Sequence, residues 1–119
     1  MPGPVAHITT RAAWAAARAV GEYAAPSLGT QGFIHASRPD AGQLLAVADF
    51  LYRGQPDLVV LLIAPERLHP ELRWEEFEPG SDLFSHLYGP VNLDAVVAVL
   101  DFPPEPDGNF RLPGPLREP

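Results

Sequence analysis

The stretch Leu58-Val59-Val60-Leu61-Leu62-Ile63 decides the fold of this chain. All six residues are apolar, so the stretch lacks the alternation of polar and apolar side chains that a strand with one wet face shows. We therefore predict a strand that is buried on both faces and lies at the centre of a sheet. The turn residues 53–57 separate this strand from the preceding part of the chain.

Two pairs of a strand and a helix are predicted before this central strand. The first pair is a strand over 5–9 and a helix over 11–20, which is capped by Thr9 or Thr10 and ends at a glycine. Helical spacing predicts a buried stripe on this helix that contains Ala13, Trp14, Ala17 and Val20. Residues 23–31 are expected to form a loop, because they include a proline and a glycine.

The second pair starts with a short strand at Phe33 and Ile34, and Ser37 is predicted to cap the helix that follows. That cap would place His35 beside the helix N-terminus, where free N–H groups attract anions. The helix is expected to run to about Tyr52, because apolar residues recur along it at helical spacing: Ala41, Leu44, Leu45, Ala48 and Leu51.

Mostly strands are predicted after the central one. We expect a helical turn over 65–68, a strand over 72–75, a polar loop over 78–85, a turn over 86–90 and a last strand over 95–102. Six prolines fall in the polar segment from Pro103 onward. We expect this segment, 103–119, to be an irregular or partly disordered tail.

The order of these elements is typical of an α+β domain. The helices gather in the first half of the chain and do not alternate with every strand. With 119 residues, the chain is expected to form one domain over 1–102, followed by the tail. No G-x-G-x-x-G or Walker sequence follows a predicted strand, so the standard phosphate-loop folds lack support.

The composition disfavours several classes of protein. A chain without cysteine has no disulfide framework, thiolate metal site or cysteine nucleophile, which suits a reducing cytoplasm. A formal net charge of −7 disfavours extended DNA or RNA, although a local pocket of Arg and His can still bind a small anion. The longest apolar run is too short to span a membrane, and the N-terminus lacks a signal-peptide pattern, so we expect a soluble cytoplasmic protein.

Two pairs of residues carry side chains suited to a small-molecule site. His35 and Ser37 lie at the end of the second predicted strand, where they can contact an anion. His86 and Tyr88 are two residues apart and share one face of an extended segment, so they suit ring stacking or proton transfer. Each pair also has a structural interpretation, in which His35 bonds a loop, Ser37 only caps a helix and the tyrosine anchors a turn.

A third pair, Arg73 and Glu75, shares one face of its predicted strand, with Trp74 on the other face in the core. The pair is either solvent-exposed, and then worth about 0–1 kcal/mol, or it faces a cleft. In a cleft, Arg73 would bind a phosphate or carboxylate and Glu75 a ribose hydroxyl. Gln43 lies off the apolar stripe of the second helix and is expected to reach toward Ser37.

Two other chemistries have less support in the sequence. A metal site could be assembled from His7, His35, His86 and Glu75. The sequence has no local pair of ligands such as H-x-H or H-x-x-x-H, so we expect no metal. Neither Ser37 nor Ser85 lies in a nucleophile elbow, which leaves a Ser-His-Asp triad without support.

Four segments taken together resemble the family catalogued as domain of unknown function 952: residues 32–37, 57–61, 72–75 and 84–89. The resemblance extends from about Val5 to Phe102, with Ser85 where the family usually has proline. Through this family the chain is similar to the ADP-ribosyltransferase superfamily, and 33–37 resembles a strand of RNA 2′-phosphotransferases that carries a nucleotide-contacting histidine. The resemblance implies a split, strongly bent, mostly antiparallel sheet whose cleft binds NAD or an ADP-ribosyl product.

The same resemblance implies roles for the ligand-binding candidates. His35 and Ser37 would contact the ribose and phosphates of the adenosine half, Arg73 would neutralise the pyrophosphate, and Tyr88 would stack on nicotinamide. NAD would then be a substrate and not a resident cofactor. The acidic net charge favours a small nucleotide or a protein side chain over RNA as the partner.

The catalytic role would fall to Glu75 or His86. Either would bond the nicotinamide ribose and stabilise the oxocarbenium-like state as the glycosidic bond breaks. Two alternatives stay open at this point. One is a regulatory module that binds a small ligand without turnover, and the other is a metal-dependent hydrolase that uses His35, His86 and Glu75.

Overall fold

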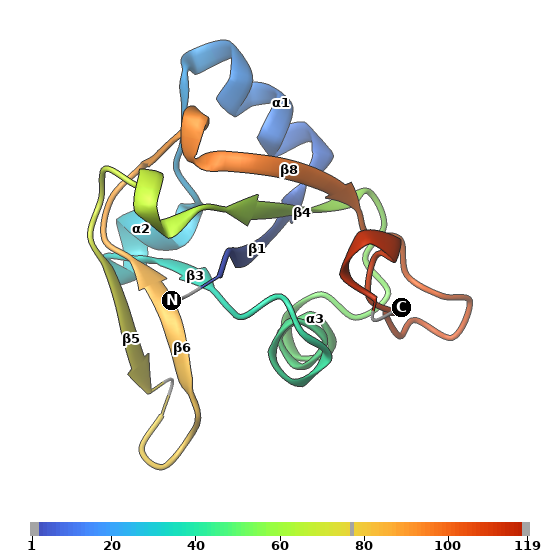
Figure 1. Cartoon of the computed structure of the whole chain (residues 1–119). Helices are drawn as coiled ribbons and strands as arrows, with labels where there is room; N and C mark the ends of the chain where they lie inside the picture. Colours follow the sequence, from blue (N-terminus) through green and yellow to red (C-terminus); the bar gives the residue numbers. More distant parts are fainter. Residues whose placement is uncertain (1–2, 77, 118–119) are drawn as a thin grey trace.

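The computed structural model of the chain describes residues 3–76 and 78–117. Its central sheet has the strand order β1 (Val5–Thr10), β4 (Leu58–Ile63) and β8 (Val96–Asp101), and both strand pairs are antiparallel. Figure 1 shows β4 running between β8 and β1. The prediction of a buried central strand is confirmed, because five of the six residues of β4 are buried.

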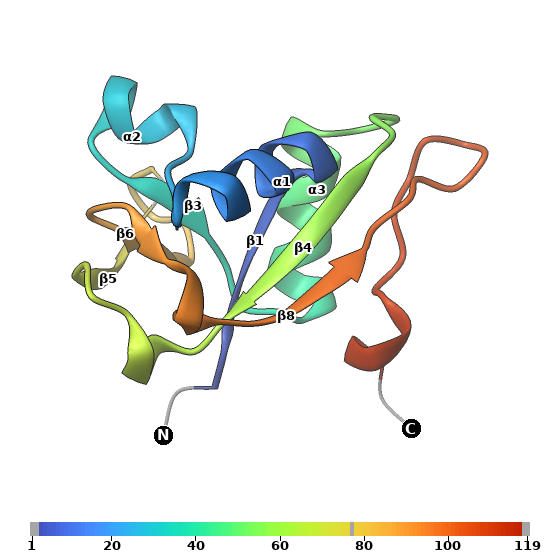
Figure 2. The same cartoon turned by 90° about the horizontal axis from the view of Figure 1, so that it is seen from above.

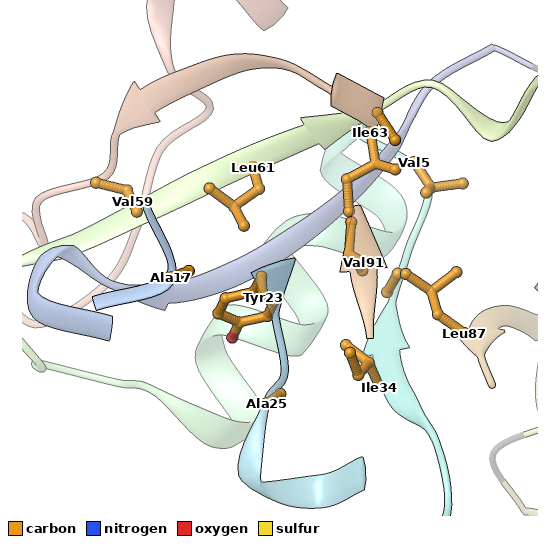
Figure 3. Packing of buried hydrophobic residues seen from close by; sticks show 12 residues of the cluster. Val5, Ala17, Tyr23, Ala25, Ile34, Val59, Leu61, Ile63, Leu87 and Val91 are labelled. Atoms are coloured by element: carbon orange, nitrogen blue, oxygen red, sulfur yellow. The ribbon is translucent and has the colours of Figure 1, made fainter. Parts of the chain in front are cut away.

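Helices cover both faces of the central sheet, as Figures 1 and 2 show. α1 (Arg11–Val20) packs on the face where the odd-numbered residues of β4 join a first core cluster. α3 (Ala46–Leu51) packs on the opposite face, where the even-numbered residues join a second cluster. Figure 3 shows Ala17 of α1 beside Val59 in the first cluster. The absence of alternation in β4 thus follows from a helix on each side.

The ends of α1 follow the predicted capping chemistry. The Thr10 hydroxyl accepts a hydrogen bond of 3.0 Å from the backbone N–H of Ala13, and Gly21 ends the helix with a left-handed φ of 105°. Three residues of the predicted stripe pack on the core: Ala13, Trp14 and Ala17. The prediction for Val20 is wrong, because this last helical residue is 77% exposed where the chain turns away from the sheet.

A second antiparallel sheet lies beside the first and has the order β3 (Ile34–Ala36), β6 (Leu83–Leu87) and β5 (Leu72–Glu76). The backbones of Ala6 and Ser37 join the two sheets through bonds of 2.7 and 2.8 Å. Antiparallel sheets with few helices confirm the α+β class. Trp74 of β5 is 38% exposed, so the expectation that it lies in the core is wrong.

Residues 23–31 do not form the predicted loop. β2 (Glu22–Tyr23) pairs with β7 (Val91–Asn92), and α2 (Pro26–Gln31) follows. Pro26 occupies the first turn of α2, where its missing N–H costs nothing, and Gly32 ends the helix with a φ of 87°. The partner of β2 lies far along the sequence, so no local pattern marks this strand.

The second predicted helix starts later than expected. Asp40, and not Ser37, is its cap, because Oδ1 of Asp40 accepts a bond of 3.0 Å from the backbone N–H of Gln43. A π-helical turn (Ala41–Leu45) leads into α3. The backbone of Ser37 is already committed to the bridge with β1, which keeps this residue extended.

The last third of the chain differs from the predicted boundaries. β6 begins at Leu83 inside the predicted polar loop, and it includes 86 and 87, which were expected to form a turn. The segment after 102 is irregular apart from one helical turn (Gly114–Leu116). The Phe110 ring stacks on Phe102 with centroids 4.7 Å apart, so this segment contributes to the second core cluster. Among the described residues, no helix is long and apolar enough to cross a membrane.

Candidate functional site

One row of side chains crosses the outer face of the second sheet. His35 of β3 pairs in register with His86 of β6, which in turn pairs with Arg73 of β5. The next row, Ile34 with Leu87, points the other way into the first core cluster, and Figure 3 shows these two side chains there. Strand alternation therefore places three predicted site residues together on one face.

Aromatic rings pack closely around the two histidines. The Phe33 ring stacks on the His86 ring with centroids 4.1 Å apart, and it meets His35 edge-on at 4.9 Å. The two imidazoles lie 5.6 Å apart at an interplanar angle of 83°, and Tyr88 lies 5.6 Å from Phe33. Phe33 thus holds three ring side chains of the candidate site in fixed positions.

Glu75 lies at the centre of the hydrogen bonding. Its Oε1 accepts a bond of 2.8 Å from Nδ1 of His86 and a short bond from the Tyr88 hydroxyl. These two bonds, that of Tyr88 first, lower the pKa of Glu75. The same carboxylate raises the pKa of Tyr88, so the phenol keeps its proton. The geometry thus holds an ionised carboxylate beside the stacked rings.

His86 keeps one ring nitrogen without a partner. Because a carboxylate can only accept, Nδ1 carries the hydrogen of the bond to Glu75. Nε2 is buried and has no hydrogen-bond partner among residues 3–76 and 78–117. An unsatisfied buried polar atom costs about 1–3 kcal/mol, and Nε2 of His86 shares this state with the hydroxyl of the adjacent Ser85. This carboxylate–imidazole arrangement is the one that orients a general base.

His35 is half-buried and contacts α2 through its ring. Its Nε2 lies within hydrogen-bond distance of Oε1 of Gln31. Burial, together with the neighbouring His86, lowers the pKa of His35 below its usual 6.5. The imidazole is therefore neutral at pH 7. It can form a hydrogen bond to a ligand but supplies no positive charge. The attraction of an anion, which the sequence predicts for His35 beside a helix N-terminus, therefore gains no charge from this ring.

Arg73 lies at the edge of this cluster. Its guanidinium makes two bonds of 3.0 Å to Glu71, and its Cζ lies 4.8 Å from the centroid of the Tyr88 ring. The pairing with Glu71 raises the pKa of Arg73 and lowers the pKa of Glu71. The ion pair of Arg73 is therefore with Glu71, and both of these side chains are more than half exposed.

A cavity of about 430 Å³ opens onto these groups and is lined by Gln31, Phe33, His35, Glu75, Glu76 and His86. The sequence predicts three of these lining residues, His35, Glu75 and His86, and does not predict the other three. Phe33 had a usable signal, since it lies two residues before His35 and thus on the same strand face. Gln31 had none, because it belongs to a helix that the sequence did not predict.

Arg73 and Tyr88 contact the ring cluster but do not line the cavity, and two further predicted ligand-binding residues, Ser37 and Gln43, lie elsewhere. Ser37 is 2% exposed, and its hydroxyl donates to the carbonyl oxygen of Arg38 at 2.9 Å. Gln43 is fully buried and lines neither this cavity nor its neighbour. Its Oε1 accepts from the backbone N–H of Arg38 at 2.9 Å, and its Nε2 donates to the carbonyl oxygen of Leu83 at 2.8 Å. These bonds tie the start of the second helical segment to β6 and do not support contact with a ligand.

The predicted anion site at the helix N-terminus is already filled by the protein. The Asp40 carboxylate accepts the backbone N–H of Gln43 and also bonds Arg38 Nε at 2.8 Å. These contacts lower the pKa of Asp40, with the Arg38 bond contributing most. A ligand phosphate would have to displace this carboxylate, so His35 does not share an anion site with the helix.

The described residues hold no group of three or more His, Asp or Glu side chains that could bind a metal ion. Glu75 and His86 bond each other directly instead of facing a common point. His7 lies behind the site, where its Nδ1 donates to the backbone carbonyl oxygen of His35 at 2.5 Å. The alternative of a metal-dependent hydrolase therefore has no support in this geometry.

Comparison with known proteins identifies relatives of the chain. Residues 8–99 match the family described as protein of unknown function (DUF952). The crystal structure of protein CC0527 from Caulobacter crescentus is 33% identical, with a TM-score of 0.80, over 92% of this chain and 94% of that chain. Its solution NMR structure is 34% identical, with a TM-score of 0.77, over 92% of each chain. No curated protein matches the chain at a significant level.

Proposed function

The chain belongs to the DUF952 family of proteins of unknown function, and we propose that it binds a small nucleotide of the NAD or ADP-ribose class and transfers the ribosyl group. In this proposal NAD is a substrate that enters the cavity beside the second sheet. The two antiparallel sheets joined at one bridge are compatible with the split sheet of ADP-ribosyltransferases. A chain without cysteine also agrees with work in the cytoplasm.

The observation that carries this proposal is the position of the Glu75 carboxylate. It lines the cavity, and its side chain is 35% exposed although it is held by Tyr88 and His86. Because its pKa is lowered, it remains an anion at neutral pH. A fixed anion next to a ribosyl carbon stabilises the positive charge that develops as the glycosidic bond breaks.

Aromatic rings beside Glu75 suit the base of such a ligand. Phe33 lines the cavity, and the Tyr88 ring lies 5.6 Å from it. Offset or edge-on packing of a nicotinamide ring on these side chains would add about 0.5–1.5 kcal/mol for each aromatic contact. The base would therefore be held by ring contacts while its ribose lies near the carboxylate.

Arg73 does not line the cavity, but in this proposal it binds the part of the ligand that extends past Tyr88, the phosphates. It already contacts Tyr88, which bonds Glu75. Its partner Glu71 is an exposed carboxylate, and exposed ion pairs contribute only about 0–1 kcal/mol. A pyrophosphate that bonds both N–H groups of the guanidinium can therefore replace Glu71 at little cost.

The proposed reaction breaks the bond between the ribosyl carbon and the nicotinamide nitrogen, and the electron pair leaves with nicotinamide. A hydroxyl, an amine or water then forms the new bond to the ribosyl carbon. The proton of this acceptor passes to Nε2 of His86, the ring nitrogen that has no partner, once the ligand has entered far enough to reach it. Glu75 stays ionised throughout and stabilises the carbon centre.

The test is a thermal-shift titration of the full chain with NAD, ADP-ribose, nicotinamide and AMP, followed by an assay of nicotinamide release from NAD. A ligand at 100 times its Kd stabilises the fold by about 2.7 kcal/mol. We expect NAD and ADP-ribose to raise the melting temperature of the wild type, and we expect His35→Ala to reduce that effect.

Glu75→Gln separates binding from chemistry. This variant keeps the shape of the side chain but removes its charge, so we expect NAD to bind with nearly unchanged affinity and nicotinamide release to fall at least tenfold. Glu66→Gln is the matched control, because Glu66 is exposed on a turn outside the cavity. Binding without release by the wild type would indicate a non-catalytic module, and no shift with any nucleotide would refute the proposal.

A further inference from the structure

A second cavity lies next to the proposed nucleotide site. It is a groove of about 830 Å³ bounded by β1, α2, β3 and α3, and it shares Gln31, His35 and His86 with the first cavity. Pockets for small organic ligands typically measure about 300–1,000 Å³. The groove is therefore large enough for a ligand of its own.

The walls of the groove are mostly apolar and almost uncharged. Small or branched side chains from three helices form much of the lining: Ala13, Pro26, Ala46, Val47 and Leu51. Among the described lining residues, Glu78 is the one carboxylate and there is no arginine. A phosphate or carboxylate would thus lose its hydration in the groove without gaining a counter-charge, which disfavours anionic ligands.

A chain of hydrogen bonds crosses the floor of the groove. Burial lowers the pKa of His7 to about 4, so its ring is neutral, and Nδ1 donates to the carbonyl oxygen of His35. Nε2 must then accept the single hydrogen of the Tyr23 hydroxyl, at 2.7 Å. The 2.9 Å contact between Tyr23 and Thr9 therefore uses the hydrogen of Thr9. This leaves the Thr9 oxygen as an acceptor only.

Two further hydroxyls of the lining, those of Ser27 and Ser37, also donate their hydrogens within the protein. Ser27 donates its hydrogen to the carbonyl oxygen of Phe33 at 2.8 Å, and Ser37 donates to that of Arg38 at 2.9 Å. Together with Thr9, these hydroxyls offer lone pairs to the groove and no hydrogens. At these three oxygens a ligand group that donates a hydrogen bond is satisfied, whereas a carbonyl or carboxylate oxygen is not. The Thr10 hydroxyl and the Gln31 amide can donate, but they belong to side chains of the lining that are less buried than Thr9.

We propose that this groove binds a small apolar ring compound that carries an N–H or O–H donor and no negative charge. The ring fills the apolar walls, and the donor bonds the oxygen of Thr9 or Ser27. The carboxylate of Glu78 in the same lining adds a preference for N–H over anionic groups. This site goes beyond the nucleotide site and does not require it to be correct.

Three probes of nearly the same shape test the proposal on the full chain by NMR titration. Indole has the ring and the N–H donor, 1-methylindole lacks the donor, and indole-3-carboxylate adds a negative charge. We expect indole to bind and 1-methylindole to bind about tenfold more weakly, because the acceptor oxygens are left unpaired. Indole-3-carboxylate should not bind at concentrations that saturate with indole.

A pair of variants places the binding in the groove. Ala46 is exposed and lines the groove, so Ala46→Trp fills part of it without disturbing the core and should weaken indole binding about tenfold. Ala41→Trp is the control, because Ala41 is exposed on the adjoining helical turn and does not line the groove. Circular dichroism and denaturant unfolding check that both variants fold.

The outcomes separate this site from the nucleotide site. Glu75 lines only the first cavity, so Glu75→Gln should bind indole like the wild type even if no nucleotide binds at all. Absence of indole binding, equal binding of the three probes, or full binding by Ala46→Trp would each overturn the proposal. Loss of nucleotide binding alone would overturn only the proposed transfer.

Discussion

The two three-stranded sheets of this molecule use their faces differently. In the central sheet, β4 buries both faces under helices, and its side chains serve only the two core clusters. In the second sheet, β6 sends Leu87 into the core and His86 to the outer face. His86 there keeps a buried ring nitrogen that no described residue satisfies.

This difference teaches where stability and ligand chemistry are located. The residues of β4 contribute burial free energy, about 25 cal/mol for each Å² of apolar area, and have no polar group to offer. On the outer face of β3, β6 and β5, the burial of polar groups costs free energy, and the apolar core behind the sheet offsets that cost. Substitutions in the central sheet should therefore change mainly the free energy of unfolding, and substitutions on the outer face of the second sheet should change mainly ligand binding.

The largest expected effect belongs to the central sheet. Leu61 is fully buried in β4, so Leu61→Ala should lower the free energy of unfolding by about 2–5 kcal/mol through lost burial and a cavity. Val99 is its partner across the strand pair but is 39% exposed. Denaturant unfolding should show a much smaller loss for Val99→Ala, and equal losses would contradict the difference between buried and exposed positions.

The next effect concerns His7, which belongs to the central sheet but supports the site through the carbonyl of His35. Its pKa is about 4 in the folded chain, against 6.5 when unfolded, so the unfolded state binds a proton first as the pH falls. The contribution of His7 to the free energy of unfolding should be fully present above pH 6.5. From this group alone, the free energy of unfolding should fall by about 3 kcal/mol by pH 4. Unfolding measured across this range should show the drop.

A variant isolates that contribution from other groups. His35 also has a lowered pKa and acts in the same direction, and Glu75 adds a further loss below its unfolded pKa of 4.5. His7→Gln removes only the first group, so its stability should depend less steeply on pH, by about 1.4 kcal/mol per pH unit between 6.5 and 4. Identical slopes for variant and wild type would show that His7 does not stay neutral.

The smallest effect on stability is expected on the outer face. Arg73→Gln breaks an exposed ion pair and should change the free energy of unfolding by less than about 1 kcal/mol. The same change should weaken ADP-ribose binding about tenfold and leave nicotinamide binding unchanged, because nicotinamide has no phosphate. Titrations with both ligands test this. Arg67→Gln is the control, because Arg67 is an exposed arginine on the turn after β4 and its guanidinium faces the backbone of Asp94 and not Tyr88.

Strand alternation and apolar spacing account for most of the fold that could be predicted. The run 58–63 and the spacing of Arg11–Val20 identify elements whose local pattern agrees with their burial. The pairing of Tyr23 with Val91 could not be predicted, since a two-residue strand is created by its distant partner. Ser37 and Asp40 are both good caps, and the bridge from Ser37 to β1 decides between them.

The candidate site was predictable where two residues share a strand face. The spacings of Arg73 with Glu75 and of His86 with Tyr88 place each pair on one side, and the register of β5 and β6 then brings the pairs together. The role of Gln43 was not predictable, because its partners at Arg38 and Leu83 depend on how the helix meets β6. Contacts between distant elements leave no local signal.

The shared position of β1 between the two sheets has a consequence for biosynthesis. Ala6 pairs with Leu62 of β4 and also bridges Ser37 at the start of the second sheet. β1 leaves the ribosome before its main partner β4, which is made only after the helices, and β8 follows later still. The nascent chain thus carries β1 without its main partner until β4 emerges, and the central sheet forms only through contacts of long sequence separation.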